Sequence, residues 1–267
     1  MPLIPIRDIT TYYEETGSGE PLILVMGLSG DIQAWALQAP TLAKHFRVIT
    51  FDNRGAGRTS APDKPQSIVG MADDLAALMD HLDIPKAHVL GWSMGGYIAQ
   101  EFAIKYSARV ERLVLVTTAA NIDGYGRAVL TSWVNAKRSN LSREQWYRFT
   151  APYLYSPGLL DDAPRFEAAI ANGANNPYAQ QDHAFIRQAE ACLAFDASDR
   201  LTSIKAPTLV VGSKDDVLVP PRNSEKLASL LPGSMLKILQ GGHVGLIEYP
   251  KEYNSAFLAF LGVADPG

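Results

Sequence analysis

Continuous apolar runs alternate with helical segments over the first 120 residues, and this alternation constrains the fold more than any other feature of the sequence. Uninterrupted apolar runs are typical of strands buried on both faces of a parallel sheet. Four such runs are predicted, at residues 21–27, 46–55, 87–91 and 112–120. Helices are expected at 35–45, from Ser67 as N-cap to residue 82, and at 97–106. With two short strands in IPIRDITTYYEE, the pattern predicts an α/β fold.

The alternation stops after the sixth predicted strand and resumes near residue 205 with PTLVVGSKDD, a helix near 223–231, the strand SMLKIL and a helix near 249–261. We therefore expect a mostly parallel eight-stranded sheet with helices on both faces. Residues 1–120 and 205–267 would form this core. Residues 121–204 would form a helical cap inserted after the sixth strand, over the carboxyl edge of the sheet, where open α/β sheets bind ligands.

The predicted cap is rich in aromatic residues. They are Tyr125, Trp133, Trp146, Tyr147, Phe149, Tyr153, Tyr155 and Phe166. We expect most of these rings to fill the core of the cap and a few to face a pocket.

Composition excludes several classes of function. The 267 residues carry a net charge of −4, whereas nucleic-acid-binding surfaces need clustered Lys and Arg. The single cysteine, Cys192, allows no intrachain disulfide. No apolar run approaches the ~18 residues of a membrane helix, and the first residues lack the features of a secretion signal. We expect a cytoplasmic protein, with no nucleic-acid or membrane partner. With no Walker A pattern, dinucleotide fingerprint or zinc spacing, we expect no cofactor and no metal.

A serine stands between glycines at the junction of a predicted strand and a predicted helix. The stretch Gly91-Trp92-Ser93-Met94-Gly95 fits the pattern G-x-S-x-G of a nucleophile elbow. A sharp turn there forces an unfavourable backbone conformation, and small neighbours avoid clashes. The Met94 N–H at the helix start could then stabilise an oxyanion. The alternative is a serine that only caps a helix after a glycine turn.

A serine nucleophile needs a base, and one histidine is placed to supply it. The chain has five histidines: His45, His81, His88, His183 and His243. His243 follows the last predicted strand, so it lies at the sheet edge that also carries Ser93. The others fall in helices, in the cap or at the opposite end of a strand, and are expected to have other roles.

The histidine in turn needs an acid that fixes its tautomer. Asp215 and Asp216 follow the strand PTLVV in the loop GSKDDVLVPP. Adjacent residues near a strand end point in opposite directions, so only one of the two can face His243. The chain order nucleophile, acid, base is that of an α/β-hydrolase triad.

The chain resembles the α/β-hydrolase superfamily over essentially its whole length, in the esterase, enol-lactonase and cofactor-free haloperoxidase branch. The motifs that carry the resemblance are LILVMGLSG, VITFDNRGAGRTS, VLGWSMGGYIAQEFA, APTLVVGSKDDVLVPP and LQGGHVGLIEYP. It implies Ser93 as nucleophile and His243 as base. Family spacing from Pro207 and from Pro220 favours Asp216 as the acid, whereas spacing from Gly212 gives Asp215.

The resemblance also implies a second oxyanion donor. Such proteins use the backbone N–H that follows a His-Gly pair after the third strand. Here the pair reads Met26-Gly27, which makes Leu28 the donor and removes a side chain that often braces this loop.

The leading hypothesis is a serine hydrolase that cleaves small-molecule carboxylic esters through an acyl-enzyme. An enol-lactonase or C–C bond hydrolase would use the same residues and a cation for a substrate carboxylate, with Arg54, Arg58 and Arg143 as candidates. A perhydrolase would make peracid at the same site. A non-catalytic ligand-binding protein is the alternative from another class. The sequence does not indicate the oligomeric state.

Overall fold

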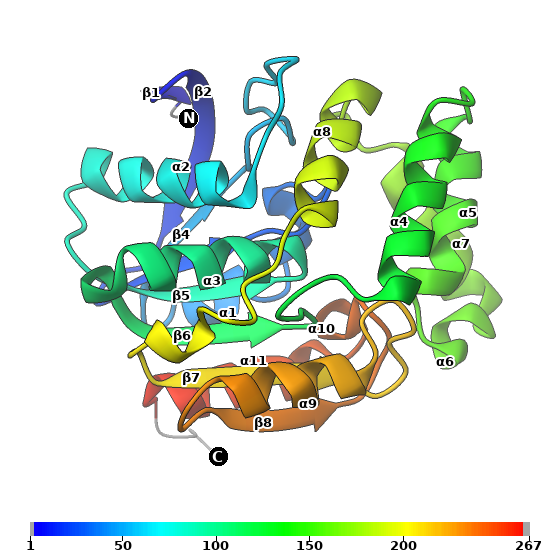
Figure 1. Cartoon of the computed structure of the whole chain (residues 1–267). Helices are drawn as coiled ribbons and strands as arrows, with labels where there is room; N and C mark the ends of the chain where they lie inside the picture. Colours follow the sequence, from blue (N-terminus) through cyan, green and yellow to red (C-terminus); the bar gives the residue numbers. More distant parts are fainter. Residues whose placement is uncertain (1–2, 264–267) are drawn as a thin grey trace.

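The computed structural model describes residues 3–263 and is built around one eight-stranded sheet, in the order β1-β2-β4-β3-β5-β6-β7-β8 (Figure 1). The strands are β1 (Leu3–Ile6), β2 (Ile9–Thr16), β3 (Pro21–Val25), β4 (Arg47–Phe51), β5 (Ala87–Trp92), β6 (Val110–Val116), β7 (Thr208–Ser213) and β8 (Met235–Leu239). β2 pairs antiparallel with β1 and with β4, and all other pairs are parallel. The predicted mostly parallel sheet is confirmed.

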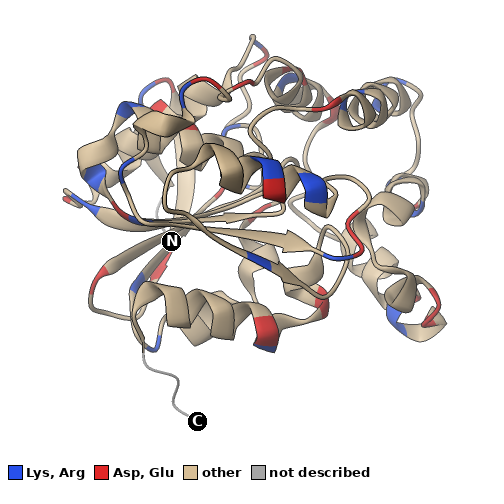
Figure 2. Cartoon of the chain, turned by 60° about the horizontal axis from the view of Figure 1, so that its bottom comes forward, with Lys and Arg blue, Asp and Glu red and all other residues tan. Residues whose placement is uncertain are grey.

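The central strands are apolar because helices cover both faces of the sheet. β3, β5 and β7 contain no Lys, Arg, Asp or Glu, and Figure 2 shows most charged residues on helices and connecting segments. Along β3, Ile23 and Val25 face one apolar cluster, while Leu22 and Leu24 face another. Two buried cores therefore lie on opposite sides of one sheet.

Helices α2 (Ile68–His81), α3 (Met94–Lys105) and α9 (Pro221–Leu230) contribute to the first core. Helices α1 (Ala39–Leu42), α10 (Gly245–Glu248) and α11 (Pro250–Leu261) contribute to the second. Short 3-10 turns are η1 (Ile32–Trp35), η2 (Ser107–Arg109) and η3 (Leu201–Ser203). The Ser67 hydroxyl accepts a hydrogen bond from Gly70 N at 3.0 Å, which confirms the predicted N-cap of α2.

The single helix expected at residues 35–45 is wrong. The structure has η1 and the four-residue α1 in its place, with Pro40 in the first turn of α1. Proline lacks an N–H, and its ring clashes with the carbonyl four residues earlier, so a continuous helix through this position is unfavourable.

Five helices stand between β6 and β7. They are α4 (Gly124–Lys137), α5 (Arg143–Leu154), α6 (Pro157–Leu160), α7 (Ala163–Ala174) and α8 (Asp182–Leu193), and we call them the helical insertion. α5 packs against α7 and α4 against α8 (Figure 1). A bridge between Asn121 and Asp196 joins the two ends of the segment. The fold thus matches the predicted α/β arrangement with a helical insertion after the sixth strand.

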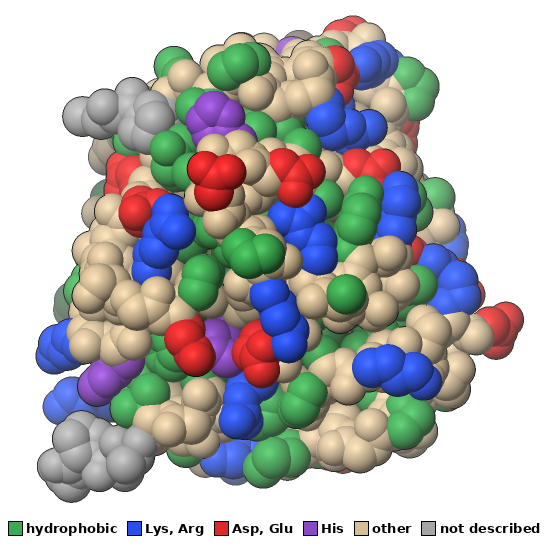
Figure 3. All heavy atoms as spheres, turned by 90° about the vertical axis from the view of Figure 1, so that its left-hand side faces the viewer, with side chains coloured by type: hydrophobic (Ala, Val, Ile, Leu, Met, Phe, Trp, Pro, Cys, Tyr) green, Lys and Arg blue, Asp and Glu red, His purple; other side chains and the backbone are tan. Residues whose placement is uncertain are grey.

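Charges on the surface are mixed in sign. On the face drawn in Figure 3, acidic and basic side chains are interspersed. The chain also forms partly exposed ion pairs such as Lys105–Asp73 and Arg109–Asp80. Pairs of this kind are screened by water and contribute little to stability.

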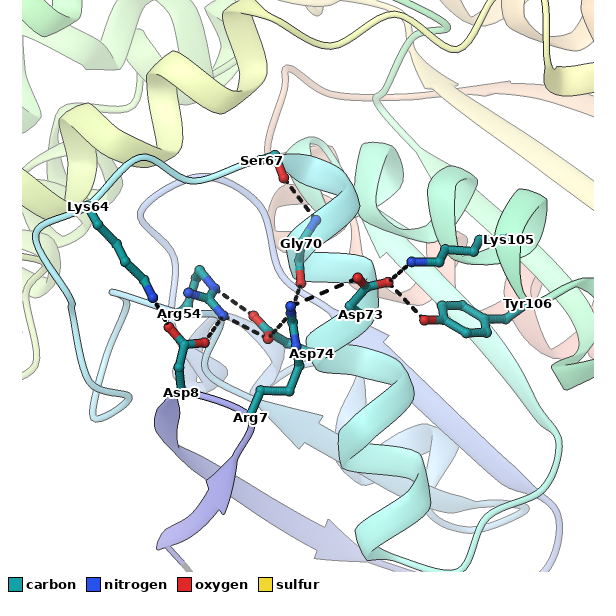
Figure 4. A network of polar contacts seen from close by, with 10 residues as sticks. All are labelled: Arg7, Asp8, Arg54, Lys64, Ser67, Gly70, Asp73, Asp74, Lys105 and Tyr106. Carbon is teal, nitrogen blue, oxygen red and sulfur yellow. Dashed lines mark hydrogen bonds and ion pairs between the residues drawn. The ribbon is translucent and has the colours of Figure 1, made fainter.

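A buried ion pair joins the loop after β4 to α2. Arg54 Nε lies 2.6 Å from Asp74 Oδ2, and each side chain is less than a tenth exposed (Figure 4). Arg54 also donates to Asp8 Oδ1 at 3.0 Å, and Asp8 pairs with Lys64. Burial opposes the charge of Arg54, but the bonds to Asp74 and Asp8 outweigh it and raise its pKa. The network fixes the β1–β2 turn and the loop after β4 against α2.

Replacing Asp74→Ala should lower the free energy of unfolding by about 3–5 kcal/mol, because it leaves a buried guanidinium without its main partner. The measurement is urea unfolding followed by circular dichroism. The control Lys105→Ala, which loses a partly exposed pair with Asp73 and a contact with the Tyr106 ring, should change the midpoint far less. The double variant Arg54→Met/Asp74→Leu should recover much of the loss. Equal midpoints for Asp74→Ala and wild type would contradict this account.

Candidate active site

Ser93 lies in a sharp turn between β5 and α3, with a backbone φ of 56° and ψ of −119°. Positive φ is costly for a serine, at about 1–3 kcal/mol, and persists only where neighbouring groups enforce it. Here Ser93 N donates to Val116 O at 2.9 Å, and Ser93 O accepts from Gly96 N and from the Thr118 hydroxyl. The turn therefore has the geometry expected of a nucleophile elbow.

The glycines on either side of Ser93 allow this turn. A Cβ at Gly91 would lie 2.3 Å from Gly95 O, and one at Gly95 would lie 2.0 Å from Val25 O. Both distances are impossible for real atoms, so a side chain at either position would push α3 away from the strand ends. The small residues beside Ser93 thus avoid the clashes that the sequence predicted for this turn.

Ser93, His243 and Asp216 form a continuous chain of hydrogen bonds. His243 Nε2 lies 2.9 Å from Ser93 Oγ, and His243 Nδ1 lies 2.8 Å from Asp216 Oδ2. The other carboxylate oxygen, Asp216 Oδ1, accepts from the amides of Leu218 and Val219. The Asp216 side chain is fully buried and that of His243 is 5% exposed, so water does not compete for these bonds.

Of the two neighbouring aspartates, Asp216 is the one whose side chain contacts His243. Asp215 is half-buried, and its backbone N–H donates to Gly241 O at 2.9 Å. Of these two candidates for the acid, the structure therefore brings Asp216 to the histidine ring.

The backbone of His243 is fixed by groups from several elements. Its carbonyl accepts from Trp92 Nε1 at 3.2 Å and from the Thr117 hydroxyl at 3.3 Å. The next amide, Val244 N, donates to Leu154 O of α5 at 3.1 Å. Trp92 therefore holds the loop that carries His243, which we call the histidine loop.

Glu248 links the histidine loop to the helical insertion, a role that the sequence did not predict. Its Oε1 accepts from Ser156 N at 3.0 Å and from Gly242 N at 3.2 Å, and its Oε2 accepts from the Ser156 hydroxyl. Gly242 immediately precedes His243. The buried carboxylate thus joins the residue before the histidine to the α5–α6 junction.

The two predicted oxyanion donors lie beside Ser93. Leu28 and Met94 both line the cavity that also contains Ser93 and His243. Met94 is the first residue of α3, where backbone N–H groups lack helical partners. A Cβ built on Gly27 would lie 3.7 Å from Ser93 Oγ, which shows how closely the Leu28 loop approaches the serine.

The Leu28 loop is held without the histidine that the family pattern places before Gly27. Asn53 Nδ2 donates to Met26 O at 2.7 Å. The Met26 side chain occupies the space beside Gly30, where a Cβ would meet its Cε at 2.4 Å. A buried amide and an apolar side chain therefore support this loop.

The cavity in front of Ser93 has a volume of about 230 Å³ and mainly apolar walls. Much of the wall comes from the helical insertion. The insertion residues include Leu130, Trp133, Trp146, Tyr147, Leu154 and Phe185. Trp133 and Trp146 also pack edge to face at 6.0 Å, whereas Tyr125 and Phe149 are exposed. The aromatic residues thus serve both the insertion's own core and the cavity.

One carboxylate lines this cavity, and no Lys or Arg does so among residues 3–263. Burial opposes ionisation of Asp123, but hydrogen bonds from Gly126 N and Asn223 Nδ2 and the exposed Arg222 guanidinium, 3.4 Å from Asp123 Oδ2, outweigh it and lower its pKa. Burial raises the pKa of the Cys192 thiol to about 12. At neutral pH the cavity wall therefore carries an anion at Asp123 and a neutral thiol at Cys192.

The arginines proposed to bind a substrate carboxylate lie elsewhere. Arg54 is held in the ion pair with α2. The Arg58 guanidinium stacks 3.7 Å from the centre of the Tyr12 ring. Arg143 donates to Asn176 O at 3.1 Å, on the surface of the insertion. None of the three lines the cavity, so the structure does not support that expectation.

Residues 3–263 contain no group of three or more His, Cys, Asp or Glu side chains arranged to hold a metal ion. Among the helices of this range, none combines the length and hydropathy of a membrane span.

Comparison with known proteins assigns the family. A family model described as the alpha/beta hydrolase fold matches residues 20–250. The chain belongs to this family. The hydrolase is 33% identical to RutD of Azorhizobium caulinodans, named as a candidate carbamate hydrolase, over 99% of this chain and 100% of the relative. It is 32% identical to BpoC of Mycobacterium tuberculosis, named as a candidate non-heme bromoperoxidase, over 95% and 98% of the two chains.

A solved structure is also closely similar to this alpha/beta hydrolase. The enol-lactonase from Burkholderia xenovorans superposes with a TM-score of 0.89 at 26% identity, covering 97% of this chain and 99% of that one. The likeness spans the sheet and the helical insertion together.

Replacing Glu248→Ala in this hydrolase should lower the free energy of unfolding by about 2–4 kcal/mol, because buried donors of Ser156 and Gly242 lose their acceptor. Glu248→Gln keeps an oxygen for both amides and should lose much less. Urea unfolding of the three proteins measures the difference. Indistinguishable stabilities would show that the link is energetically unimportant.

Proposed function

We propose that this hydrolase cleaves carboxylic esters through an acyl-enzyme formed on Ser93. The observation that carries the proposal is the hydrogen-bond chain from Ser93 Oγ through the His243 ring to Asp216. The distances are those at which a base can take a proton from a nucleophile. Ser93 and His243 also line an apolar cavity, where a substrate carbonyl can reach the serine.

In the first half of the reaction, Ser93 Oγ attacks the ester carbonyl carbon while His243 Nε2 takes the hydroxyl proton. The carbonyl π electrons move to oxygen, and the N–H groups of Leu28 and Met94 stabilise the oxyanion. When the C–O bond to the alcohol breaks, His243 returns the proton to the leaving oxygen. In the second half, water replaces the alcohol, attacks the acyl-enzyme by the same route and releases the acid and free Ser93.

Asp216 acts on the histidine in this scheme. With Nδ1–H donating to Asp216 Oδ2, the His243 ring presents an unprotonated Nε2 to the serine. The buried carboxylate also stabilises the imidazolium that forms when the proton moves. Two backbone amides keep its second oxygen in place.

The cavity favours neutral, short, apolar acyl groups. Its volume of about 230 Å³ is below the roughly 300–1,000 Å³ of pockets for drug-sized ligands. The described cavity wall carries the Asp123 carboxylate, which pairs with Arg222 outside the cavity, and it carries no Lys or Arg. A substrate carboxylate would therefore find no cationic partner on this wall. This argues against an enol-lactone or C–C bond substrate that carries its own carboxylate.

A neutral lactone is the second candidate substrate. It presents the same carbonyl chemistry, and the similarity to an enol-lactonase covers the whole fold.

Perhydrolysis, suggested by the name of BpoC, would need hydrogen peroxide in place of water in the second half-reaction. We further propose that residues 121–204 act as the cap of the site, since their side chains supply much of the cavity wall.

The charge of the acyl group provides a direct test. The protein should hydrolyse 4-nitrophenyl butyrate with a kcat/KM at least 10-fold above that for the monoanionic 4-nitrophenyl succinate. The matched variant Asp123→Asn, which retains a good N-cap for α4, should reduce this preference several-fold. Faster hydrolysis of the succinate would contradict the proposed substrate class, and hydrolysis of neither ester would contradict the esterase proposal.

The two aspartates provide a matched pair for the acid. Asp216→Asn should lower kcat for 4-nitrophenyl butyrate by about 10³–10⁴-fold, since the amide favours the wrong tautomer of His243. Asp215→Asn should stay within about threefold of wild type, because its side chain does not contact the ring. Steady-state kinetics with circular dichroism as a folding control decides between them. The reverse ranking would reassign the acid to Asp215.

A further inference from the structure

Gln188 of α8 is fully buried and uses both ends of its side-chain amide. Its Oε1 accepts from Ser29 N at 3.1 Å, and its Nε2 donates to Arg54 O at 2.9 Å. Ser29 follows Leu28, the proposed oxyanion donor, while Gln188 lies 159 residues further along the chain. A residue of the helical insertion is thus hydrogen-bonded directly to the Leu28 loop.

The hydrogen bond from Ser29 N to Gln188 affects the orientation of the Leu28 N–H, because neighbouring peptide planes are joined at a shared α-carbon. The Leu28 N–H belongs to the peptide between Gly27 and Leu28, and each peptide is rigid. Asn53 holds the preceding peptide by its oxygen, Met26 O, at 2.7 Å. Gln188 holds the following peptide by its nitrogen, Ser29 N. The plane that carries the donor therefore lies between two planes that are each held by a buried side-chain amide.

The loop needs this support. Ser29 has a φ of 68°, which is unfavourable for a serine, and the turn is closed by a long bond of 3.4 Å from Gly30 N to Gly27 O. The carbonyl that anchors Gln188 is itself firmly placed, because the Arg54 side chain is held in the buried pair with Asp74 (Figure 4). A line of buried contacts thus runs from α2 through Arg54 and Gln188 to Ser29.

We propose that Gln188 is a positioning residue for the Leu28 oxyanion donor, an inference that rests on the proposed ester hydrolysis. Gln188 does not line the cavity and acts through the Leu28–Ser29 peptide. Its contribution is greatest in the transition state, when negative charge develops on the carbonyl oxygen. The helical insertion then takes part in the chemistry as well as in binding.

The test compares Gln188→Met with Gln180→Met. Methionine has nearly the shape of glutamine and cannot make its hydrogen bonds. Gln180 is the control, because this half-buried glutamine also donates to the loop after β4, from Nε2 to Gly55 O at 3.0 Å, and makes no hydrogen bond to the Leu28 loop. Gln188→Met should lower kcat for 4-nitrophenyl butyrate about 10- to 100-fold with KM within threefold, and Gln180→Met should leave both near wild type.

Inhibition by a boronic acid such as butylboronic acid separates positioning from a general loss of structure. This compound forms a tetrahedral adduct with a serine and places an oxygen in the oxyanion site. Its Ki should rise in Gln188→Met by about the same factor as kcat falls. An unchanged kcat, or a lower kcat with an unchanged Ki, would overturn the inference.

If Gln188→Met does not fold, Gln188→Glu serves in its place, because it keeps an acceptor for Ser29 N. An ionised glutamate cannot donate to Arg54 O, so a folded variant should lose kcat and boronic-acid affinity by a similar factor, and a loss of kcat alone would contradict the inference. Failure of the proposed function is distinct from either result, since wild type itself would then fail to hydrolyse the ester.

Discussion

The backbone of Ser93 is the constraint around which the site is built. A φ of 56° exposes the serine oxygen at the sheet edge, and the surrounding structure must offset the cost of this conformation. The parallel register of β5 and β6 places Val116 O where Ser93 N can reach it. Gly95 allows α3 to approach Val25 at the end of β3. Because β7 and β8 also run parallel to β6, the loops after them end at this edge, so His243 reaches Ser93 and Asp216 reaches His243 from separate strands.

The helical insertion is bonded to both sides of this site. On one side Gln188 holds the Leu28 loop, and on the other Leu154 O and Ser156 hold the residues around His243. The insertion therefore does more than cover the cavity. Its contacts link the Leu28 loop and the histidine loop to the same set of helices.

Local patterns were enough to predict the α/β fold, the turn at Ser93 and the position of His243, because each depends on short-range periodicity or on a residue at a strand end. The choice between Asp215 and Asp216 needed the side-chain directions that the structure supplies. Gln188 and Glu248 could not be predicted, since their partners lie far away in the sequence and glutamine or glutamate in a helix is usually solvated. For the same reason the sequence does not show that Arg54, a candidate for substrate binding, is paired with Asp74 in the interior.

The central claim is that the hydrogen-bond chain from Asp216 makes Ser93 a nucleophile. Reaction with a fluorophosphonate, followed by peptide mass spectrometry and by the rate of adduct formation, tests it most directly. The account predicts one adduct, on Ser93, none in Ser93→Ala, and a rate lowered by orders of magnitude in His243→Ala. An adduct on another residue, or an equal rate without the histidine, would contradict it.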